Sequence, residues 1–286
     1  MTSPLFLTKK FDLRAKKQLG QNFLSDPSTA KMIVDRSGID QNDIILEIGA
    51  GFGALTIPAA QAARKIFTVE KDLRIIPVLE NELSSHKIDN AVILSTDILK
   101  LDIAALAQAE DCRFVVLGNL PYNISSQILI RLMAARNVIK RAVLMFQKEM
   151  AQRIGASPSC KDYSRISVMT QYLADVKPVA QIKAHLFSPR PKVDSEVIEI
   201  VFKNKKQVLA ENEDFFFRVI KAGFGKRRKN LKNALSGSEL KISAETAILA
   251  LEQSGINPVR RAETLSVAEF VTLSNELFAI QREISA

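Results

Sequence analysis

The stretch DIILEIGAGFGALT, residues 43–56, determines the fold class of this 286-residue chain. Its first half is a run of branched apolar residues, which predicts a buried strand. Its second half places Gly49, Gly51 and Gly53 ahead of a helical pattern. Glycines between a strand and a helix let a ligand approach the backbone closely at the carboxyl end of a sheet. The stretch therefore predicts an α/β fold with a nucleotide-type pocket.

Apolar runs alternate with helical patterns on both sides of this stretch. A helix is expected from Pro27 to a stop at Gly38, and another after the glycine-rich turn through Ala63. Pro77 is expected to delay or kink the following helix pattern, residues 73–83. Further strands are expected at residues 65–70, 91–95, 113–119 and 141–147, with a loop at 155–164 and a late, half-exposed strand at 196–202. Strands that alternate with helices predict a mostly parallel sheet covered on both faces.

No strand pattern follows residue 203. The later patterns, 215–224, 243–253 and 266–280, are helical, and Ser266 and Glu269 have the spacing of a capping box. We therefore predict an α/β domain over residues 1–205 and a small all-helical domain over residues 206–286.

Basic residues gather in two segments of a chain whose net charge is +9. The first segment contains no acid and comprises Lys221, Lys226, Arg227, Arg228, Lys229 and Lys232. The second is opposed only by Asp12 and comprises Lys9, Lys10, Arg14, Lys16 and Lys17. A single charge run is usually a solvated face, but clustered cations gain affinity by releasing counterions from a phosphate backbone. Two such segments favour a nucleic acid partner, bound above all by Lys226, Arg227, Arg228 and Lys229 on an expected basic helix, KRRKNLKNAL (226–235).

Several classes of protein do not fit the composition. No uncharged run reaches the roughly 18 apolar residues of a membrane span, and the N-terminal residues lack the order of a secretory signal, so we expect a cytosolic protein. Two cysteines, Cys112 and Cys160, and two histidines, His86 and His185, predict neither a disulfide nor a metal site.

Two acids stand at the ends of successive strands. Glu70 is placed to accept hydrogen bonds from ribose hydroxyls, and Asp97 could accept one from an adenine amine. Residues 49–54, GAGFGA, also fit a dinucleotide fingerprint, so a dehydrogenase remains open at this point. Either carboxylate could instead cap the next helix.

The sequence Asn119-Leu120-Pro121-Tyr122 ends the strand at residues 113–119 and separates these alternatives. An adenine N6 is a poor nucleophile because its lone pair is delocalised into the ring. If the Asn119 side-chain oxygen and the Leu120 carbonyl each hold one N6 hydrogen, the amine becomes more tetrahedral and its lone pair is exposed to a methyl donor. Tyr122 offers a face on which a flipped base can stack. The scheme needs no general base, since the methylated nitrogen releases its proton to water.

Further motifs complete a pattern that covers nearly the whole chain. They are KKQLGQNFL (16–24), TDIL (96–99), QKEMAQR (147–153), FSPRPKVDS (187–195) and RAETLSVAEF (261–270). With the glycine-rich turn and NLPY, they resemble the KsgA/RsmA family of ribosomal RNA small-subunit adenine N6,N6-dimethyltransferases, which share a fold with the Erm antibiotic-resistance methyltransferases. The resemblance implies a Rossmann-like class I methyltransferase domain with a small helical C-terminal domain. It also implies dimethylation, with S-adenosyl-L-methionine, of two adjacent adenosines near the 3′ end of small-subunit ribosomal RNA.

The resemblance also implies roles for individual residues. Asn22 and Leu24 are expected to close over the cofactor, Gly49 to line its methionine part, Glu70 to bind its ribose, Asp97 its adenine, and Asn119 both cofactor and target. Phe187 resembles the family's second aromatic, which sandwiches the target base opposite Tyr122, although from the residues alone simple packing is the expectation.

Three alternatives remain beside this interpretation. An Erm-like enzyme would methylate large-subunit RNA, and a ribosome assembly factor would act chiefly by binding immature small subunits. A dehydrogenase function would explain neither the NLPY motif nor the two basic segments. We expect a monomer, because an extended RNA surface already gives the basic segments a partner.

Overall fold

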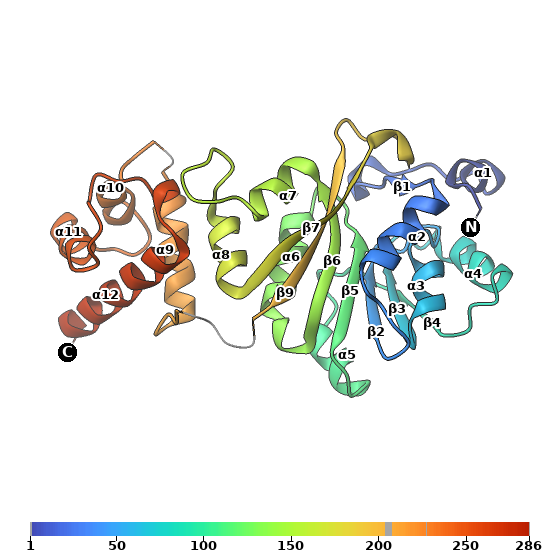
Figure 1. The fold of residues 1–286 in the computed structure, drawn as a ribbon, viewed down its shortest axis with the longest axis horizontal. Helices are drawn as coiled ribbons and strands as arrows, with labels where there is room; N and C mark the ends of the chain where they lie inside the picture. Colours follow the sequence, from blue (N-terminus) through green and yellow to red (C-terminus); the bar gives the residue numbers. More distant parts are fainter. Residues whose placement is uncertain (1, 204–207, 227, 286) are drawn as a thin grey trace. The chain divides into compact units, whose positions relative to one another are not determined.

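A seven-stranded sheet forms the framework of the computed structural model, which describes residues 2–203, 208–226 and 228–285 (Figure 1). The strand order is β4-β3-β2-β5-β6-β9-β7. The strands are β2 (Ile44–Ile48), β3 (Lys65–Glu70), β4 (Ala91–Ser95), β5 (Phe114–Asn119), β6 (Ile139–Gln147), β7 (Ala174–Ile182) and β9 (Ser195–Phe202). From β4 to β6 all neighbours are parallel, and β9 runs antiparallel to β6. The predicted mostly parallel sheet is confirmed.

The strand order reverses between β2 and β5, and this reversal positions the site. From β2 the chain moves outward through β3 to β4, and it then returns to the other side of β2 at β5. In open parallel sheets, ligands bind at such a reversal, outside the carboxyl ends of the strands. The ends concerned here are Ile48, Glu70 and Asn119.

The helices that connect or precede the strands of this sheet are α2 (Pro27–Arg36), α3 (Thr56–Ala62), α4 (Ile76–Ser85), α5 (Ile103–Ala109) and α6 (Ser125–Ala134). The start of α2 follows from its sequence, because the Asp26 carboxylate accepts the Thr29 N–H at 2.8 Å and Pro27 occupies the first turn. Ile33 of α2 and Ala59 of α3 pack with Ile45 and other sheet residues in one apolar cluster. The cluster covers one face of the sheet.

Most predicted boundaries are confirmed. Helix α4 begins at Ile76 with Pro77 in its first turn, as the expected delay requires, and residues 155–164 form a loop. The sequence patterns missed β7, helix α1 (Pro4–Lys10) and a two-stranded sheet in which β1 (Phe23–Leu24) pairs with β8 (Phe187–Ser188). Strands of two residues carry no periodicity that a sequence pattern could detect.

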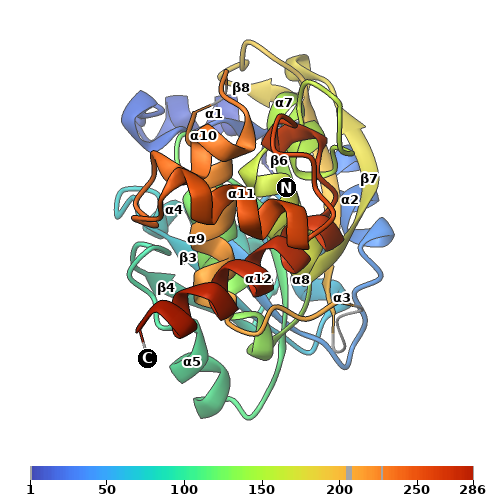
Figure 2. The same cartoon turned by 90° about the vertical axis from the view of Figure 1, so that its left-hand side faces the viewer.

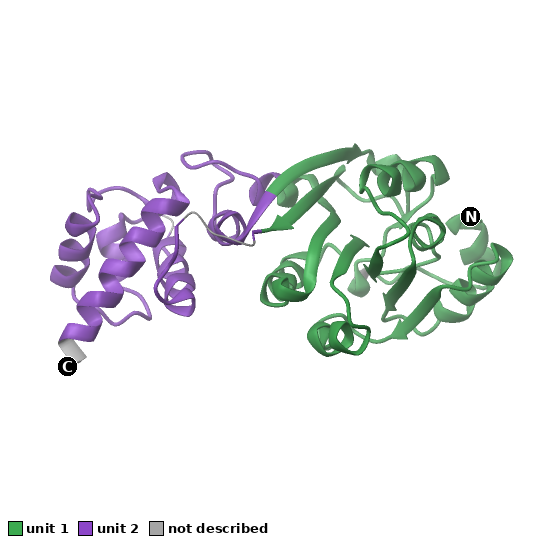
Figure 3. Ribbon diagram, turned by 60° about the horizontal axis from the view of Figure 1, so that its bottom comes forward, with its two compact units in different colours: residues 1–151, 176–202 green, residues 152–175, 203–286 purple. Residues whose placement is uncertain are grey.

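The chain divides into two compact units, residues 1–151 with 176–202 and residues 152–175 with 203–286 (Figure 3). The contacts group residues 152–175 with the C-terminal helices, and the predicted division at 205/206 falls on residues outside the described ones. The assignment of functions to domains therefore stays a prediction.

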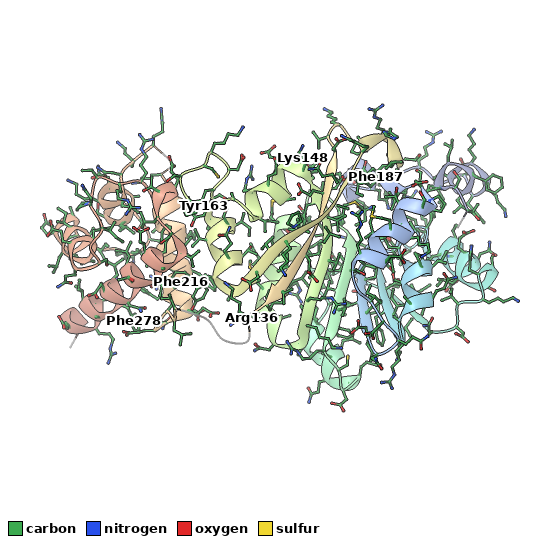
Figure 4. All side chains as sticks on the ribbon, viewed as in Figure 1. Arg136, Lys148, Tyr163, Phe187, Phe216 and Phe278 are labelled. Carbon is green, nitrogen blue, oxygen red and sulfur yellow. The ribbon has the colours of Figure 1, made fainter. Side chains whose placement is uncertain are left out.

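The second unit is helical. It holds α8 (Arg165–Leu173), α9 (Glu213–Phe224), α10 (Leu231–Ser236), α11 (Ala244–Gln253) and α12 (Val267–Ser285), while α7 (Lys148–Ile154) spans its first boundary. Figure 2 shows α9–α12 packed against one another. The Phe216 ring of α9, labelled in Figure 4 beside α12, lies with its centroid 4.4 Å from that of Tyr172 in α8. The capping box of α12 is confirmed, with Ser266 N–H donating to Glu269 at 2.7 Å and Glu269 N–H to Ser266 at 3.2 Å.

The basic segment 226–235 is not the single helix that its sequence predicts, because α10 begins only at Leu231. Helix α9 ends at Phe224, and a turn follows before α10 begins at Leu231. The break has a local cause, because the Asn230 side chain accepts the Asn233 N–H at 3.1 Å and so starts a new helix. The predicted RNA-binding residues Lys226, Arg228 and Lys229 are exposed in that turn, and Arg227 lies outside the described residues.

Within the residues that the structure describes, no helix is both long and apolar enough to cross a membrane.

Candidate active site

Two adjoining cavities lie at the carboxyl ends of β2, β3 and β5. The larger one is lined by Leu19, Gly20, Gln21, Asn22, Phe23, Gly49, Gly51, Glu70, Asn119, Leu120 and Pro121. The smaller one shares Phe23, Gly49, Gly51 and Asn119 with it and adds Pro4, Leu24, Glu47, Ala50, Phe52, Ala54 and Leu55. Six of the predicted residues therefore come together here: Asn22, Leu24, Gly49, Glu70, Asn119 and Leu120.

The glycine-rich turn is held tightly between two other segments. Gly49 has φ +80°, and a Cβ on it would lie 3.3 Å from the Asn119 carbonyl oxygen. Gly51 has φ +53°, and its Cβ would lie 3.0 Å from the Phe23 ring. Because both positions combine a left-handed backbone with close neighbours, only glycine fits without a shift. The turn exposes its backbone to the cavities for this reason.

Glu70 fixes that turn to the end of β3. Its Oε2 accepts the Gly51 N–H at 3.0 Å and its Oε1 accepts the Asp72 N–H at 2.8 Å. Burial raises the pKa of the Glu70 carboxyl, although the two backbone hydrogen bonds partly oppose this rise. The side chain is 8% exposed and lines the larger cavity, and each oxygen can still accept from a ligand hydroxyl.

A second buried acid, Glu47, lines the smaller cavity, and the sequence patterns did not single it out. Its Oε2 accepts from the hydroxyls of Thr56, at 2.7 Å, and Thr68, at 2.5 Å. Burial raises the pKa of Glu47 to about 7 despite these hydrogen bonds. The Glu47 carboxyl therefore titrates near neutral pH.

We expect Glu47→Gln to remove a pH dependence of stability. Because the folded-state pKa is raised, the folded protein binds the proton more tightly than the unfolded chain does. The free energy of unfolding of the wild type should therefore fall as the pH rises from about 4.5 to about 7, by up to about 3 kcal/mol. Urea unfolding between pH 5 and pH 8 should show this loss in the wild type and in the control Glu252→Gln, at an exposed position, but not in Glu47→Gln. If the free energy of unfolding depended on pH equally in all three proteins, the raised pKa of Glu47 would be contradicted.

The Asn119 amide connects NLPY to the segment at residues 16–24. Its Nδ2 donates to the Asn22 carbonyl at 2.9 Å, and no described residue donates to its side-chain oxygen. The neighbouring Asn123 makes a parallel link, with Nδ2 donating to the Gln18 carbonyl at 2.9 Å. The Asn119 oxygen is thus oriented by its own amide group and available to a ligand at the cavity.

The two predicted base-stacking residues, Tyr122 and Phe187, lie in different surroundings. The Tyr122 hydroxyl and the Ser195 hydroxyl are 2.7 Å apart, which fixes the Tyr122 ring, and burial raises the pKa of Tyr122. Phe187 lies in β8 opposite Leu24 and is only 4% exposed within the apolar cluster that also contains Ile33 (Figure 4). Phe187 is therefore a core residue in this conformation, and its role as a base-stacking partner of Tyr122 stays a prediction.

Asp97 lines neither cavity. Its carboxylate accepts from Lys71 Nζ at 2.7 Å and from the Leu99 N–H at 3.0 Å. Burial raises the pKa of Asp97, but these hydrogen bonds and the charges of Lys71 and Lys100 outweigh it, so the pKa lies below its usual value. A contact between Asp97 and an adenine remains a prediction.

A polar network that the sequence patterns missed holds residues 16–24 over the larger cavity. Gln21 Nε2 donates to Asp72 at 3.1 Å, and the Gln21 oxygen accepts the Lys16 N–H at 2.7 Å. Asp72 also accepts from Arg74 at 2.6 Å, and this hydrogen bond is the main reason that the pKa of Asp72 falls to about 2. The KKQLGQNFL motif indicated that residues 16–24 belong to the site, but it did not predict the hydrogen bond to Asp72.

Comparisons with known proteins identify the family of this chain. A family model described as "Ribosomal RNA adenine dimethylase" matches residues 12–278. A protein of Desulforapulum autotrophicum named "Ribosomal RNA small subunit methyltransferase A" is 52% identical over 280 residues, covering 98% of each chain. A protein of the same name from Shouchella clausii is 40% identical and covers 97% of this chain and 94% of its own length.

Solved structures give the same result. A dimethyladenosine transferase from Plasmodium falciparum is 26% identical with a TM-score of 0.76, covering 91% of this chain and 98% of its own. The 23S rRNA methyltransferase ErmE is 25% identical with a TM-score of 0.67, covering 90% and 100%. The family match over residues 12–278 leaves no support for the dehydrogenase alternative. The chain belongs to the ribosomal RNA adenine dimethylase family.

Proposed function

We propose that this protein uses S-adenosyl-L-methionine to dimethylate the N6 amines of two adjacent adenosines near the 3′ end of small-subunit ribosomal RNA. The reaction comprises four methyl transfers, two per adenosine, and takes place in the cytoplasm. The single observation that carries the proposal is the Asn119 amide oxygen, oriented by the bond to Asn22 and open to a glycine-lined cavity that also contains Glu70.

The cavities suit S-adenosylmethionine, which supplies an electrophilic sulfonium methyl when bound. The Glu70 oxygens can accept hydrogen bonds from ribose hydroxyls. Gly49 and Gly51 have no side chains, so their backbone lines the cavity directly. Asn22 and Leu24 line the two cavities from the KKQLGQNFL segment and are proposed to cover the cofactor. Asp97 is proposed to bind the adenine, which requires that it share or exchange its contact with Lys71.

The target adenine is proposed to enter beside NLPY. The Asn119 side-chain oxygen and the Leu120 carbonyl accept the two N6 hydrogens and make the amine more tetrahedral. Tyr122, whose ring is fixed through Ser195, stacks on the extruded base, and Phe187 would complete the sandwich after moving out of the core. After methyl transfer, the cationic nitrogen loses its proton to water.

The choice between subunits rests on the relatives' names. The curated relatives described above are named for the small subunit, whereas the ErmE structure is named for 23S rRNA. The deciding experiment is transfer of labelled methyl from S-adenosylmethionine to purified unmethylated small and large subunits, followed by nucleoside analysis. Dimethyladenosine on the small subunit alone supports the proposal, label on the large subunit supports an Erm-like enzyme, and no label on either supports a pure binding role.

The proposed partner is an immature small ribosomal subunit, bound by a monomer of this protein. In a chain with net charge +9, the exposed basic turn between α9 and α10 supports contact with phosphates. A role as assembly factor is compatible with catalysis, because methylation can mark release of the particle.

We expect Arg228→Gln with Lys229→Gln to flatten the salt dependence of RNA binding. If each side chain neutralises one phosphate, the log–log slope should become shallower by about 1 to 2. Filter binding of unmethylated small-subunit RNA at several salt concentrations measures this slope. The control is Lys177→Gln with Lys241→Gln, which removes two exposed charges elsewhere. A slope equal to that of the wild type would show that the basic turn does not meet phosphates.

A further inference from the structure

Exposed aromatic rings occur at one place in the described part of the chain. Of its phenylalanine and tyrosine side chains, only Phe6 and Phe11 are exposed, at 56% and 38%. The chain contains no tryptophan. Leu5, beside Phe6, is 55% exposed. Apolar side chains gathered in this way on a surface mark an interaction site more often than single exposed ones do.

The helix that carries these residues is firmly docked. Leu7 of α1 is 1% exposed and packs with Phe23, Phe52 and Ile75. The Thr2 N–H donates to the carboxylate of Glu82 in α4 at 3.0 Å. Because Leu7 holds one side of α1 against the protein, the exposure of Leu5 and Phe6 is a fixed property of the surface.

Cations are interleaved with the exposed rings. Lys9, Lys10 and Arg14 are exposed, and none of them forms an ion pair within the described ranges. Lys10 Nζ lies 5.2 Å from the centroid of the Phe11 ring. Asp12 is the only acid between residues 2 and 25. Rings for stacking and cations for phosphates are the combination that binds single-stranded nucleic acid.

The same helix borders the candidate active site. Pro4 of α1 lines the smaller cavity together with Gly49 and Asn119, and Phe23 belongs both to the Leu7 cluster and to the lining of the two cavities. Farther along, Arg74 Nη2 donates to the Arg14 carbonyl at 3.4 Å, which keeps the segment after α1 on the turn that follows β3. This surface is therefore next to the position proposed for the methyl donor.

We propose that α1 and the residues up to Arg14 form a second RNA-contact surface, which holds the unpaired nucleotides flanking the target adenosines. Phe6 stacks on a base, and Lys9, Lys10 and Arg14 meet phosphates. This inference rests on the proposed function, because it takes ribosomal RNA as the substrate. Helix α1 itself precedes residues 12–278, the range that the family model matches.

The test measures methyl transfer to unmethylated small subunits by the full-length protein. Phe6→Ala should raise KM for the subunit about tenfold and leave kcat within about twofold, because stacking of one base contributes to binding only. Phe6→Trp should restore KM. The control Leu249→Ala removes an exposed apolar side chain from α11, outside this surface, and should leave KM unchanged. Lys9→Gln with Lys10→Gln should also make the salt slope of RNA binding shallower by about 1 to 2.

A second measurement identifies the occupant directly. With the photoreactive residue p-benzoylphenylalanine in place of Phe6, irradiation of the protein–subunit complex should crosslink ribosomal RNA. Crosslinks to ribosomal protein alone, or an unchanged KM for Phe6→Ala, would overturn the inference. So would binding to phosphatidylglycerol vesicles that Leu5→Ala and Phe6→Ala weaken equally while RNA binding stays constant. If the wild type methylates neither subunit, the proposed function fails, and the crosslink still decides whether α1 contacts RNA.

Discussion

Asn119→Ala should lower kcat for methyl transfer to small subunits by about 100- to 1000-fold. The substitution removes the one side-chain oxygen at the cavity that the Asn22 contact orients toward a ligand. Without this acceptor, one N6 hydrogen has no partner and the amine stays conjugated with the ring. Single-turnover transfer of labelled methyl at saturating S-adenosylmethionine measures the loss free of any change in cofactor affinity.

The neighbouring amide provides a matched control. Asn123→Ala also breaks one side-chain link to residues 16–24, the hydrogen bond to the Gln18 carbonyl, but Asn123 lines neither cavity. We expect its rate to fall less than about tenfold, since it loses anchoring alone. If both variants lost the same activity, Asn119 would act only as an anchor, and the proposed acceptor role would be wrong.

Subunit binding by Asn119→Ala separates catalysis from assembly. The basic turn at Lys226, Arg228 and Lys229 lies in the other compact unit and is unchanged by the substitution. The affinity for immature small subunits should therefore stay within about twofold of the wild type. Loss of binding together with catalysis would remove the support for two separable roles.

The parts of the fold that follow from sequence are those with a strong local signal. The strand–glycine–helix pattern at Gly49 to Gly53, the Asp26 cap of α2 and the Ser266–Glu269 capping box each satisfy backbone groups within a few residues. Such local signals can be recognised in the sequence without knowledge of any tertiary contact. The site residues at strand ends, Glu70 and Asn119, could be placed together because parallel strands end at one edge of the sheet.

The remainder depends on contacts between distant segments. Phe187 is buried because β8 pairs with β1, across more than 160 residues, and two-residue strands leave no pattern. The break in the basic segment is the exception, because its cause is the local Asn230 cap, which the sequence analysis overlooked. The Lys71 contact of Asp97 also could not be predicted, since it joins residues that follow two different strands, 26 positions apart in the sequence.

Glu70→Gln should weaken S-adenosylmethionine binding about 30- to 100-fold, as measured by titration calorimetry. Glutamine has one acceptor oxygen, so it can serve only one of the Gly51 and Asp72 N–H groups and must turn an NH₂ toward the other. It also loses the charge that would strengthen hydrogen bonds from ribose hydroxyls. We expect Asp97→Asn to cost less than about tenfold, because Asp97 lines neither cavity and already accepts from Lys71.

A loss of affinity in Glu70→Gln has two physical sources, since Glu70 both holds the Gly51 turn and faces the larger cavity. The 2′-deoxy analogue of S-adenosylhomocysteine separates them. If the carboxylate binds the ribose, removing the 2′-hydroxyl should weaken binding to the wild type at least about tenfold and have little effect in Glu70→Gln, because the partner is already gone. Equal losses in both proteins would mean that Glu70 acts only through the turn, and the ribose contact would then have to be assigned to another group at the cavity.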